Sequence, residues 1–190
     1  MKIYAVKIIE LIKKYFFDLK LKKKFLLAEH YRHKNLLPPQ KINTILIIFD
    51  ATDESKCKEI FDIVADLQNQ KKEVRALGYV PYKEMPHYCL PKLSYDYLSK
   101  KHINFFDIPT ASFINDIIKM NFNLLINFML HNIRPIEYVA ALSKAQIKIG
   151  NPHLQLKEYE IYDIVIMRKN DDNNEFYKNI FHYLPLLKTK

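Results

Sequence analysis

The sequence predicts an α/β fold, namely one Rossmann-like three-layer domain with a mostly parallel sheet of about six strands, preceded by a long basic amphipathic N-terminal helix. Two observations predict the domain. Short apolar runs alternate with amphipathic segments along residues 42–190. Most of these runs lack strict alternation between apolar and polar residues, which is typical of strands covered on both faces. Strands that alternate with helices form parallel sheets.

The N-terminal helix is predicted over residues 3–31, because apolar residues recur there at intervals of three and four. The apolar side of this helix consists of Tyr4, Ile8, Leu11, Ile12, Tyr15, Phe16, Leu19 and Leu26. Lysines gather on the other side, with Val6, Phe17 and Leu21 among them. We expect the apolar side to pack on the domain and the helix to end before the Pro38-Pro39 pair, which cannot continue it.

The first elements of the domain follow from four segments. Residues 44–49 (TILIIF) form a continuous apolar run and predict a buried strand. A helix is predicted over residues 53–70, because polar residues that favour helix starts precede an amphipathic pattern. Residues 72–80 predict a second strand, and the proline-flanked stretch 81–91 predicts a loop.

The middle of the domain is predicted to continue the alternation. We expect a helix at 93–101, a third strand at 103–106, a helix at 111–120 and a fourth strand at 123–128. The two strands are predicted from short apolar runs and the helices from wider spacing of apolar residues.

The last part of the chain completes the pattern. A helix is predicted at 135–145, where the leading proline suits the first turn of a helix. Strands are predicted at 146–150 and 161–167, and a closing helix at 173–187. In such a sheet, ligands bind at the carboxyl ends of the strands, so residues that follow strands are the first candidates for a site.

Positive charge is concentrated at the N-terminal end. Residues 1–41 contain 11 Lys/Arg and 3 Asp/Glu, a net charge of +8, whereas residues 42–190 contain 19 and 18, a net charge of +1. We therefore divide the chain into a basic helical arm with a Pro-Pro hinge, residues 1–41, and the Rossmann-like domain, residues 42–190. A basic arm beside a nearly neutral domain indicates a polyanionic partner.

We expect a non-enzymatic, cytoplasmic binding protein whose arm associates with RNA or a ribonucleoprotein by neutralising phosphates. The predicted phosphate contacts are Lys13, Lys14, Lys20, Lys22, Lys23, Lys24 and Arg32. Two alternatives for the arm stay open: an interfacial helix on an anionic membrane, and a homodimer formed through the apolar side. Cytoplasmic location is expected from the small number of cysteines, the lack of a signal-like segment and the lack of a stretch of ~20 apolar residues.

Several kinds of site are excluded or weakened by composition. The chain has two glycines, Gly78 and Gly150, both at strand ends where glycine permits a tight turn. It has no G-x-G-x-x-G and no Walker sequence, so dinucleotide binding in the ordinary Rossmann manner is not expected. We predict no cofactor and no metal site, because His30 and His33, one helical turn apart, have no identifiable third ligand. Cys57 and Cys89 fit no metal motif.

Asp53 is the one catalytic candidate, because it follows the first strand. A carboxylate there caps the next helix, or alternatively binds a hydroxyl or acts as a base. His131 and His153, each shortly after a predicted strand, would meet Asp53 at the carboxyl edge of the sheet.

Two segments carry a resemblance to known proteins. The run ILIIFDATD with its following helix, and the segment 123–150, resemble the N-terminal half of heptosyltransferase-type glycosyltransferases. The chain also looks like a small uncharacterised family of short proteins from Bacteroidetes. The first resemblance implies that Asp53 matches the proposed general base of those enzymes, with Thr52 in place of their glycine. Only forty residues follow Gly150, too few for the nucleotide-sugar-binding half, so it implies a degenerate half-domain that binds a sugar or nucleotide-sugar.

Overall fold

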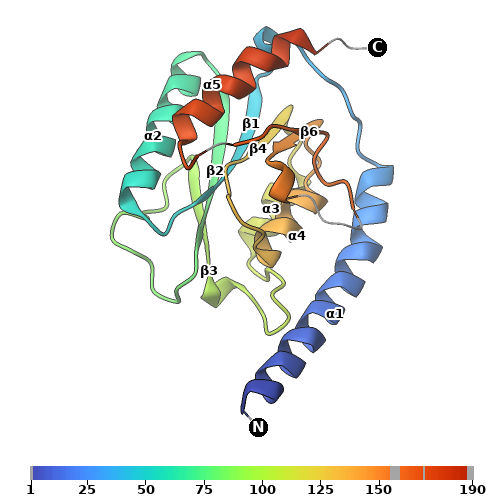
Figure 1. Cartoon of the computed structure of the whole chain (residues 1–190). Helices are drawn as coiled ribbons and strands as arrows, with labels where there is room; N and C mark the ends of the chain where they lie inside the picture. Colours follow the sequence, from blue (N-terminus) through green and yellow to red (C-terminus); the bar gives the residue numbers. More distant parts are fainter. Residues whose placement is uncertain (1, 155–158, 169, 188–190) are drawn as a thin grey trace.

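The computed structural model describes residues 2–154, 159–168 and 170–187. In this part of the chain, six strands form one sheet in the order β3-β2-β1-β4-β5-β6, and every neighbouring pair is parallel. Figure 1 shows the sheet between two groups of helices, with α1 running along one side of the molecule. The predicted α/β class and Rossmann-like sheet are confirmed.

The strands are β1 (Thr44–Asp50), β2 (Glu73–Val80), β3 (Tyr95–Ser99), β4 (Leu124–Asn127), β5 (Ile147–Gly150) and β6 (Ile164–Val165). The α-helices are α1 (Lys2–His30), α2 (Glu54–Asn69), α3 (Ser112–Lys119), α4 (Arg134–Leu142) and α5 (Asn173–Tyr183). The strand order reverses between β1 and β4, and the carboxyl ends of strands beside such a switch point are where sheets of this kind bind ligands.

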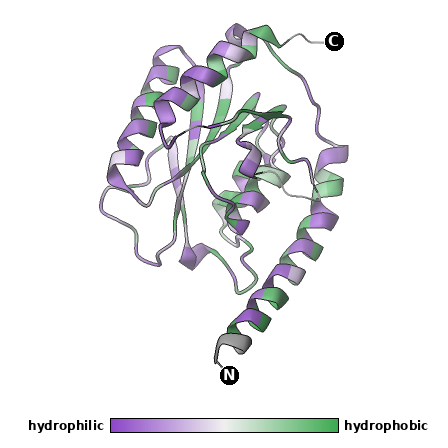
Figure 2. Cartoon of the chain, in the orientation of Figure 1, coloured by the Kyte–Doolittle hydropathy of each residue, from purple (hydrophilic) through white to green (hydrophobic). Residues whose placement is uncertain are grey.

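Strand β1 lies at the centre of the sheet, and this position explains why its sequence is continuously apolar. Ile45, Ile47 and Phe49 belong to the core cluster that packs under α2 and α5. Leu46 and Ile48 belong to the second cluster, under α3 and α4. Both faces are therefore buried, and the hydrophobic contrast that marks a half-exposed strand is lost. Figure 2 shows hydrophobic segments through the sheet and also along the length of α1.

Two predicted elements are wrong. Residues predicted as a helix at 93–101 contain strand β3, whose Tyr97 pairs with Gly78 of β2. Tyrosines at alternate positions favour a strand. This edge strand is so short, however, that its alternating pattern is hard to recognise in the sequence. The strand predicted at 103–106 is a turn, because the side-chain oxygen of Asn104 accepts hydrogen bonds from the backbone N–H groups of Phe106 and Ile108.

The two glycines allow aromatic rings to approach the sheet, whereas the sequence suggested tight turns. A Cβ atom on Gly78 would lie 2.7 Å from Cδ1 of Tyr97, and one on Gly150 would lie 2.7 Å from Cδ1 of Tyr162. Neither glycine has a positive φ. These residues are therefore required for packing space and not for backbone conformation.

Candidate functional site: the surface of helix α1

Helix α1 is docked on the domain through one row of residues. Phe17, Leu21 and Phe25 are 1%, 0% and 6% exposed and belong to the core that contains α4. The ring centroid of Phe17 lies 6.4 Å from that of Tyr138 on α4. Burial of such side chains contributes about 1.5–3 kcal/mol each. The docked row includes the two residues that the sequence placed among the lysines, so the predicted docking side is wrong.

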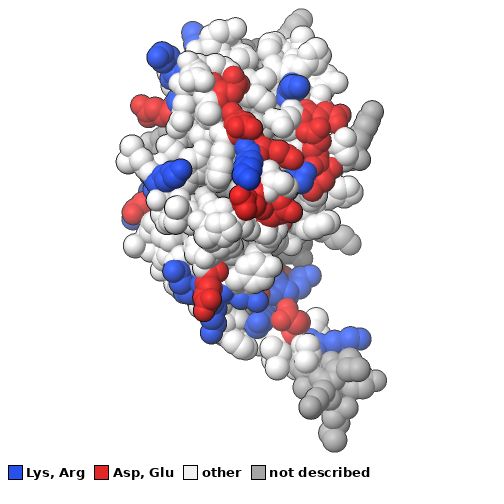
Figure 3. Space-filling view, turned by 90° about the vertical axis from the view of Figure 1, so that its left-hand side faces the viewer, with Lys and Arg blue, Asp and Glu red and all other residues white. Residues whose placement is uncertain are grey.

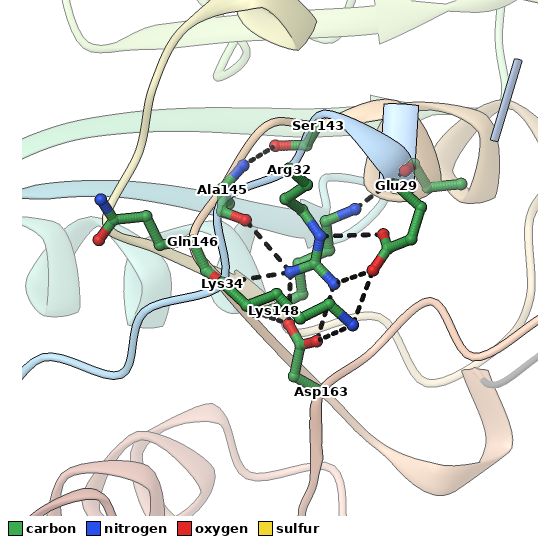
Figure 4. Close-up of polar contacts among 9 residues, drawn as sticks. Glu29, Arg32, Lys34, Ser143, Ala145, Gln146, Lys148 and Asp163 are labelled. Carbon is green, nitrogen blue, oxygen red and sulfur yellow. Dashed lines mark hydrogen bonds and ion pairs between the residues drawn. The ribbon is translucent and has the colours of Figure 1, made fainter. Parts of the chain in front are cut away.

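A polar cluster fixes the end of α1 to the sheet (Figure 4). The guanidinium of Arg32 donates to Asp163 from Nη1 at 2.7 Å and from Nη2 at 2.8 Å, and to Glu29 from Nε at 2.9 Å and Nη2 at 2.6 Å. Its Nη1 also donates to the carbonyl oxygens of Ala145 and Gln146. Burial alone would raise the pKa of Asp163, but the hydrogen bonds from Arg32 hold this pKa below its usual value.

This cluster corrects the prediction for Arg32. Its side chain is 1% exposed, and all of its N–H directions are used by carboxylates and carbonyls. Arg32 is therefore unavailable to a phosphate and acts as an anchor between α1 and the segment before β6. Lys34 adds to the same anchor, with its ammonium 2.7 Å from Glu29 and 3.1 Å from Asp163.

The six lysines predicted as phosphate contacts divide into two groups. Lys24 donates from Nζ to the Tyr138 hydroxyl at 2.6 Å, and Lys13 lies 3.5 Å from Glu10 and 5.1 Å from the ring centroid of Phe105. These two border the docked side of the helix. The other four are exposed and form no ion pair within the described residues: Lys14, Lys20, Lys22 and Lys23.

The side of α1 that faces away from the domain is apolar. We call this row the outer stripe; it consists of Ile8, Ile12, Tyr15, Leu19 and Leu26, which are 55%, 45%, 64%, 54% and 59% exposed. Leu19 lies ~200° around the helix from Phe17, since each residue turns the helix by ~100°. By the same geometry, Lys22 and Lys23 lie on either side of the stripe. A row of exposed apolar residues of this size marks an interaction surface.

The sequence identified the residues of the outer stripe but not their exposure. Both sides of α1 carry apolar residues spaced by three and four, so periodicity alone does not select the docked side. The anchor partner Asp163 was also missed. The pair of Glu29 and Arg32, at positions i and i+3, is the one part of this anchor that the sequence alone predicts as an ion pair.

The other predicted site residues lie at the carboxyl edge of the sheet. Asp53 is the N-cap of α2: its Oδ1 accepts from the backbone N–H of Ser55 at 2.7 Å and of Lys56 at 3.3 Å. Its pKa is lowered, first by the hydrogen bond from the Ser55 side chain, which disfavours a role as a base. Asp53 and His131 line one cavity of about 240 Å³, and His153 is not among its lining residues. A catalytic role for Asp53 stays a prediction.

Neither a metal site nor a membrane span emerges from the described residues. No group of three potential metal-ligating side chains occurs among them, and His30 instead lies against Tyr31, with ring centroids 4.9 Å apart. Among the same residues, no helix combines the length and apolar content needed to cross a bilayer.

Comparisons with known proteins identify a family and no more than a family. No curated protein and no solved structure matches the chain. One family model does match, and it spans most of α1 together with the whole sheet. The chain belongs to the family of unknown function DUF6913, whose model matches residues 13–187.

Proposed function

We propose that the protein associates peripherally with an anionic membrane surface, with the outer stripe of α1 inserted among the lipid headgroups and the exposed lysines beside it. The observation that carries the proposal is the exposure of the outer stripe on a helix whose opposite side is already buried. A helix with an apolar row and flanking lysines is suited to lie in the plane of a membrane interface.

Charge complementarity favours lipid over a second copy of the chain. Residues 6–31 contain seven lysines and three acidic residues, a net charge of +4. Ile8, Ile12, Tyr15 and Leu19 follow a heptad spacing, and Lys22 takes the next position in that spacing before Leu26. A homodimer through the stripe would bring two positively charged helices together, whereas an anionic lipid surface neutralises them.

The stripe also favours lipid over RNA. Phosphates are bound by cations, and unpaired bases are bound by aromatic side chains. Four of the five stripe residues are aliphatic and Tyr15 is the exception, so most of this surface offers neither interaction. RNA association through the lysines remains the prediction from the sequence, and the same experiment tests it.

The charge distribution gives a preferred orientation. Figure 3 shows acidic side chains gathered in the upper part of one face, at the level of α2 and α5, and mostly lysine and arginine in the lower part, towards the N-terminal half of α1. Helix α2 contains Glu54, Glu59, Asp62 and Asp66, and the start of α5 and the residues just before it contain Asp171, Asp172 and Glu175. An anionic membrane attracts the α1 side and repels the α2 side.

The expected affinity comes from two contributions. A basic residue close to an anionic leaflet contributes about 1 kcal/mol, and full burial of an aliphatic side chain contributes about 1.5–3 kcal/mol. Replacement of Lys20, Lys22 and Lys23 by glutamine is therefore expected to weaken binding by roughly 100-fold. The pair Ile12→Gln and Leu19→Gln is expected to weaken it by at least about 10-fold.

Vesicle flotation tests the proposal with the full chain. We expect binding to phosphatidylcholine vesicles that contain phosphatidylserine, little binding to phosphatidylcholine alone, and loss of binding in both variants. A variant with Lys92, Lys101 and Lys119 replaced by glutamine is the matched control, because these lysines are exposed on the domain. It should bind as the original protein does. Circular dichroism confirms that each variant is folded.

The contrary outcomes are specific. Absence of binding to anionic vesicles overturns the proposal. Binding to structured RNA that depends on the α1 lysines but is unchanged in the Ile12→Gln, Leu19→Gln variant supports the RNA prediction instead. A concentration-dependent dimer that this same variant abolishes, without vesicle binding, assigns the stripe to self-association.

A further inference from the structure

A second candidate surface, separate from the outer stripe, lies at the carboxyl edge of the sheet. A cleft of about 650 Å³ opens where β1, β2 and β3 end and where α4 begins, and α1 closes one of its sides. We propose that this cleft binds a phosphorylated small molecule of nucleotide size. The inference does not depend on membrane attachment, because it uses other residues and another side of α1.

Cationic side chains from four separate segments converge on the cleft. Lys13 comes from α1, Lys83 follows β2, Lys100 follows β3 and Arg134 begins α4. The residues after position 41 have a net charge of only +1, so this convergence does not reflect a generally basic domain. Clustered cations in a recess attract anions more strongly than the same cations on a convex surface.

Two of the three acidic residues that line the cleft, Glu10 and Asp107, are already paired with a cation. Asp107 accepts from Nη1 of Arg134 at 2.5 Å, and Glu10 lies 3.3 Å from Nη2 of the same guanidinium. Asp50 accepts the backbone N–H of Thr52 at 2.9 Å. Arg134 is thereby held in place at the start of α4.

Lys83 and Lys100 are the cations left for a ligand. Both are exposed, and neither forms an ion pair within the part of the chain that the structure describes. They follow neighbouring strands, β2 and β3, and so border the same edge of the sheet. These two ammonium groups provide positive charge for one phosphate.

The cleft also offers an aromatic surface. The ring of Phe105 lines the cleft and is 61% exposed, and Tyr79 contributes a second, mostly buried ring. An exposed aromatic ring beside cations suits a ligand with both a planar base and a phosphate. The volume falls within the range of small-molecule sites, and these features favour a nucleoside phosphate over inorganic phosphate.

The position of the cleft and the sequence of its loops both indicate that side chains, and not a glycine-rich loop, would hold the phosphate. The cleft lies at the edge where parallel sheets bind ligands. The first strand-to-helix turn lacks the glycines that let backbone N–H groups surround a pyrophosphate. Side chains at the ends of β2 and β3 and at the start of α4 would replace this backbone cradle.

Calorimetric titration of the full chain with uridine diphosphate, adenosine diphosphate, pyrophosphate and uridine tests the proposal. We expect saturable binding of at least one diphosphate nucleotide, weaker binding of pyrophosphate and no binding of uridine. The double variant Lys83→Ala, Lys100→Ala is expected to weaken nucleotide binding by about 10-fold or more. The matched control is Lys92→Ala, Lys101→Ala, which removes two exposed lysines outside the cleft.

Three results would overturn the proposal: no saturable binding of either diphosphate nucleotide, equal binding of uridine, or equal weakening in the two double variants. Failure of vesicle binding leaves this result unaffected, and failure of nucleotide binding leaves the membrane proposal unaffected. Thermal unfolding of each variant separates loss of the cleft from loss of the fold.

Discussion

Arg32 and Asp163 form a two-bond ion pair, with Nη1–Oδ2 at 2.7 Å and Nη2–Oδ1 at 2.8 Å, between residues 131 positions apart in the chain. The pair joins the end of α1 to the segment that leads into β6. Glu29 and two backbone carbonyls complete the hydrogen bonding of the guanidinium. Removal of one member of such a buried pair is strongly destabilising, because it leaves the remaining charge buried and uncompensated.

Arg32→Met is therefore expected to lower the free energy of unfolding by about 3–5 kcal/mol. The cause is the buried carboxylate of Asp163, which loses its main donor. Urea denaturation measures the change, and Arg75→Met is the control. Arg75 pairs with Asp96 at 2.6 Å, but both side chains are partly exposed, at 30% and 17%, so the loss there should be about 1 kcal/mol or less. Equal losses would contradict the anchor role.

Glu137 is expected to make stability depend on pH. It is 6% exposed in α4, and burial raises its pKa from 4.5 to about 7, opposed by Arg134 and Lys14 and assisted by Asp18. The folded chain therefore binds this proton more tightly than the unfolded chain does. The contribution of Glu137 to stability therefore decreases as pH rises from about 4.5 to about 7, by a total on the order of 3 kcal/mol.

Glu137→Gln should remove this decrease and stabilise the protein above about pH 7. Urea denaturation of the original and variant chains at about pH 5 and about pH 8 measures it. The variant is expected to gain more stability at the higher pH than at the lower. A pH profile that the substitution leaves unchanged would mean that Glu137 is ionised in the folded protein at little cost.

Gly150→Ala is expected to destabilise the protein by about 1–3 kcal/mol through overpacking. The added Cβ would lie 2.7, 2.8 and 3.0 Å from ring atoms of Tyr162. That ring is 4% exposed, and its hydroxyl accepts a hydrogen bond from Asn127 at 2.6 Å, so it has little freedom to move away. Thermal denaturation measures the loss. In combination with Tyr162→Leu, the added cost of the alanine should shrink, and full additivity would count against a clash.

Lys71→Gly is expected to stabilise the protein by about 0.5–1 kcal/mol. Lys71 follows α2 and has a φ of 63°, a conformation that costs energy for a residue with a Cβ. Its side chain is exposed, so glycine removes the strain and little else. Chemical denaturation gives the sign. Asp107 has a similar φ of 60° but pairs with Arg134, so Asp107→Gly is the contrasting variant and should not stabilise.

Local pattern predicted the sheet well because burial on both faces leaves a mark in a short segment. The run from Thr44 to Phe49 is almost continuously apolar, and strand β1 occupies it. The edge strand β3 was missed because five residues with two tyrosines carry too few repeats to separate a period of two from one of 3.6.

The arm illustrates a different limit. Two rows on α1 have helical spacing, one with Phe17, Leu21 and Phe25 and the other the outer stripe, and only a distant partner such as Tyr138 selects between them. Arg32 was assigned to a ligand for the same reason, since Asp163 is not its neighbour in sequence. Charge could be counted from the sequence, but pairing depends on the tertiary structure.

Leu19 and Leu21 provide a direct test of which side of α1 is docked, because they are two positions apart on one helix and chemically identical. Leu21 is 0% exposed and Leu19 is 54% exposed. Leu21→Ala leaves a cavity against the α4 layer and is expected to cost about 2–5 kcal/mol of unfolding free energy. Leu19→Ala removes a solvated side chain and should change stability by no more than about 0.5 kcal/mol. Urea denaturation of the two variants compares them, and alanine preserves the helix in both. A larger loss for Leu19 would mean that the outer stripe is the docked side, and the lysines around Phe17 would then be the exposed ones.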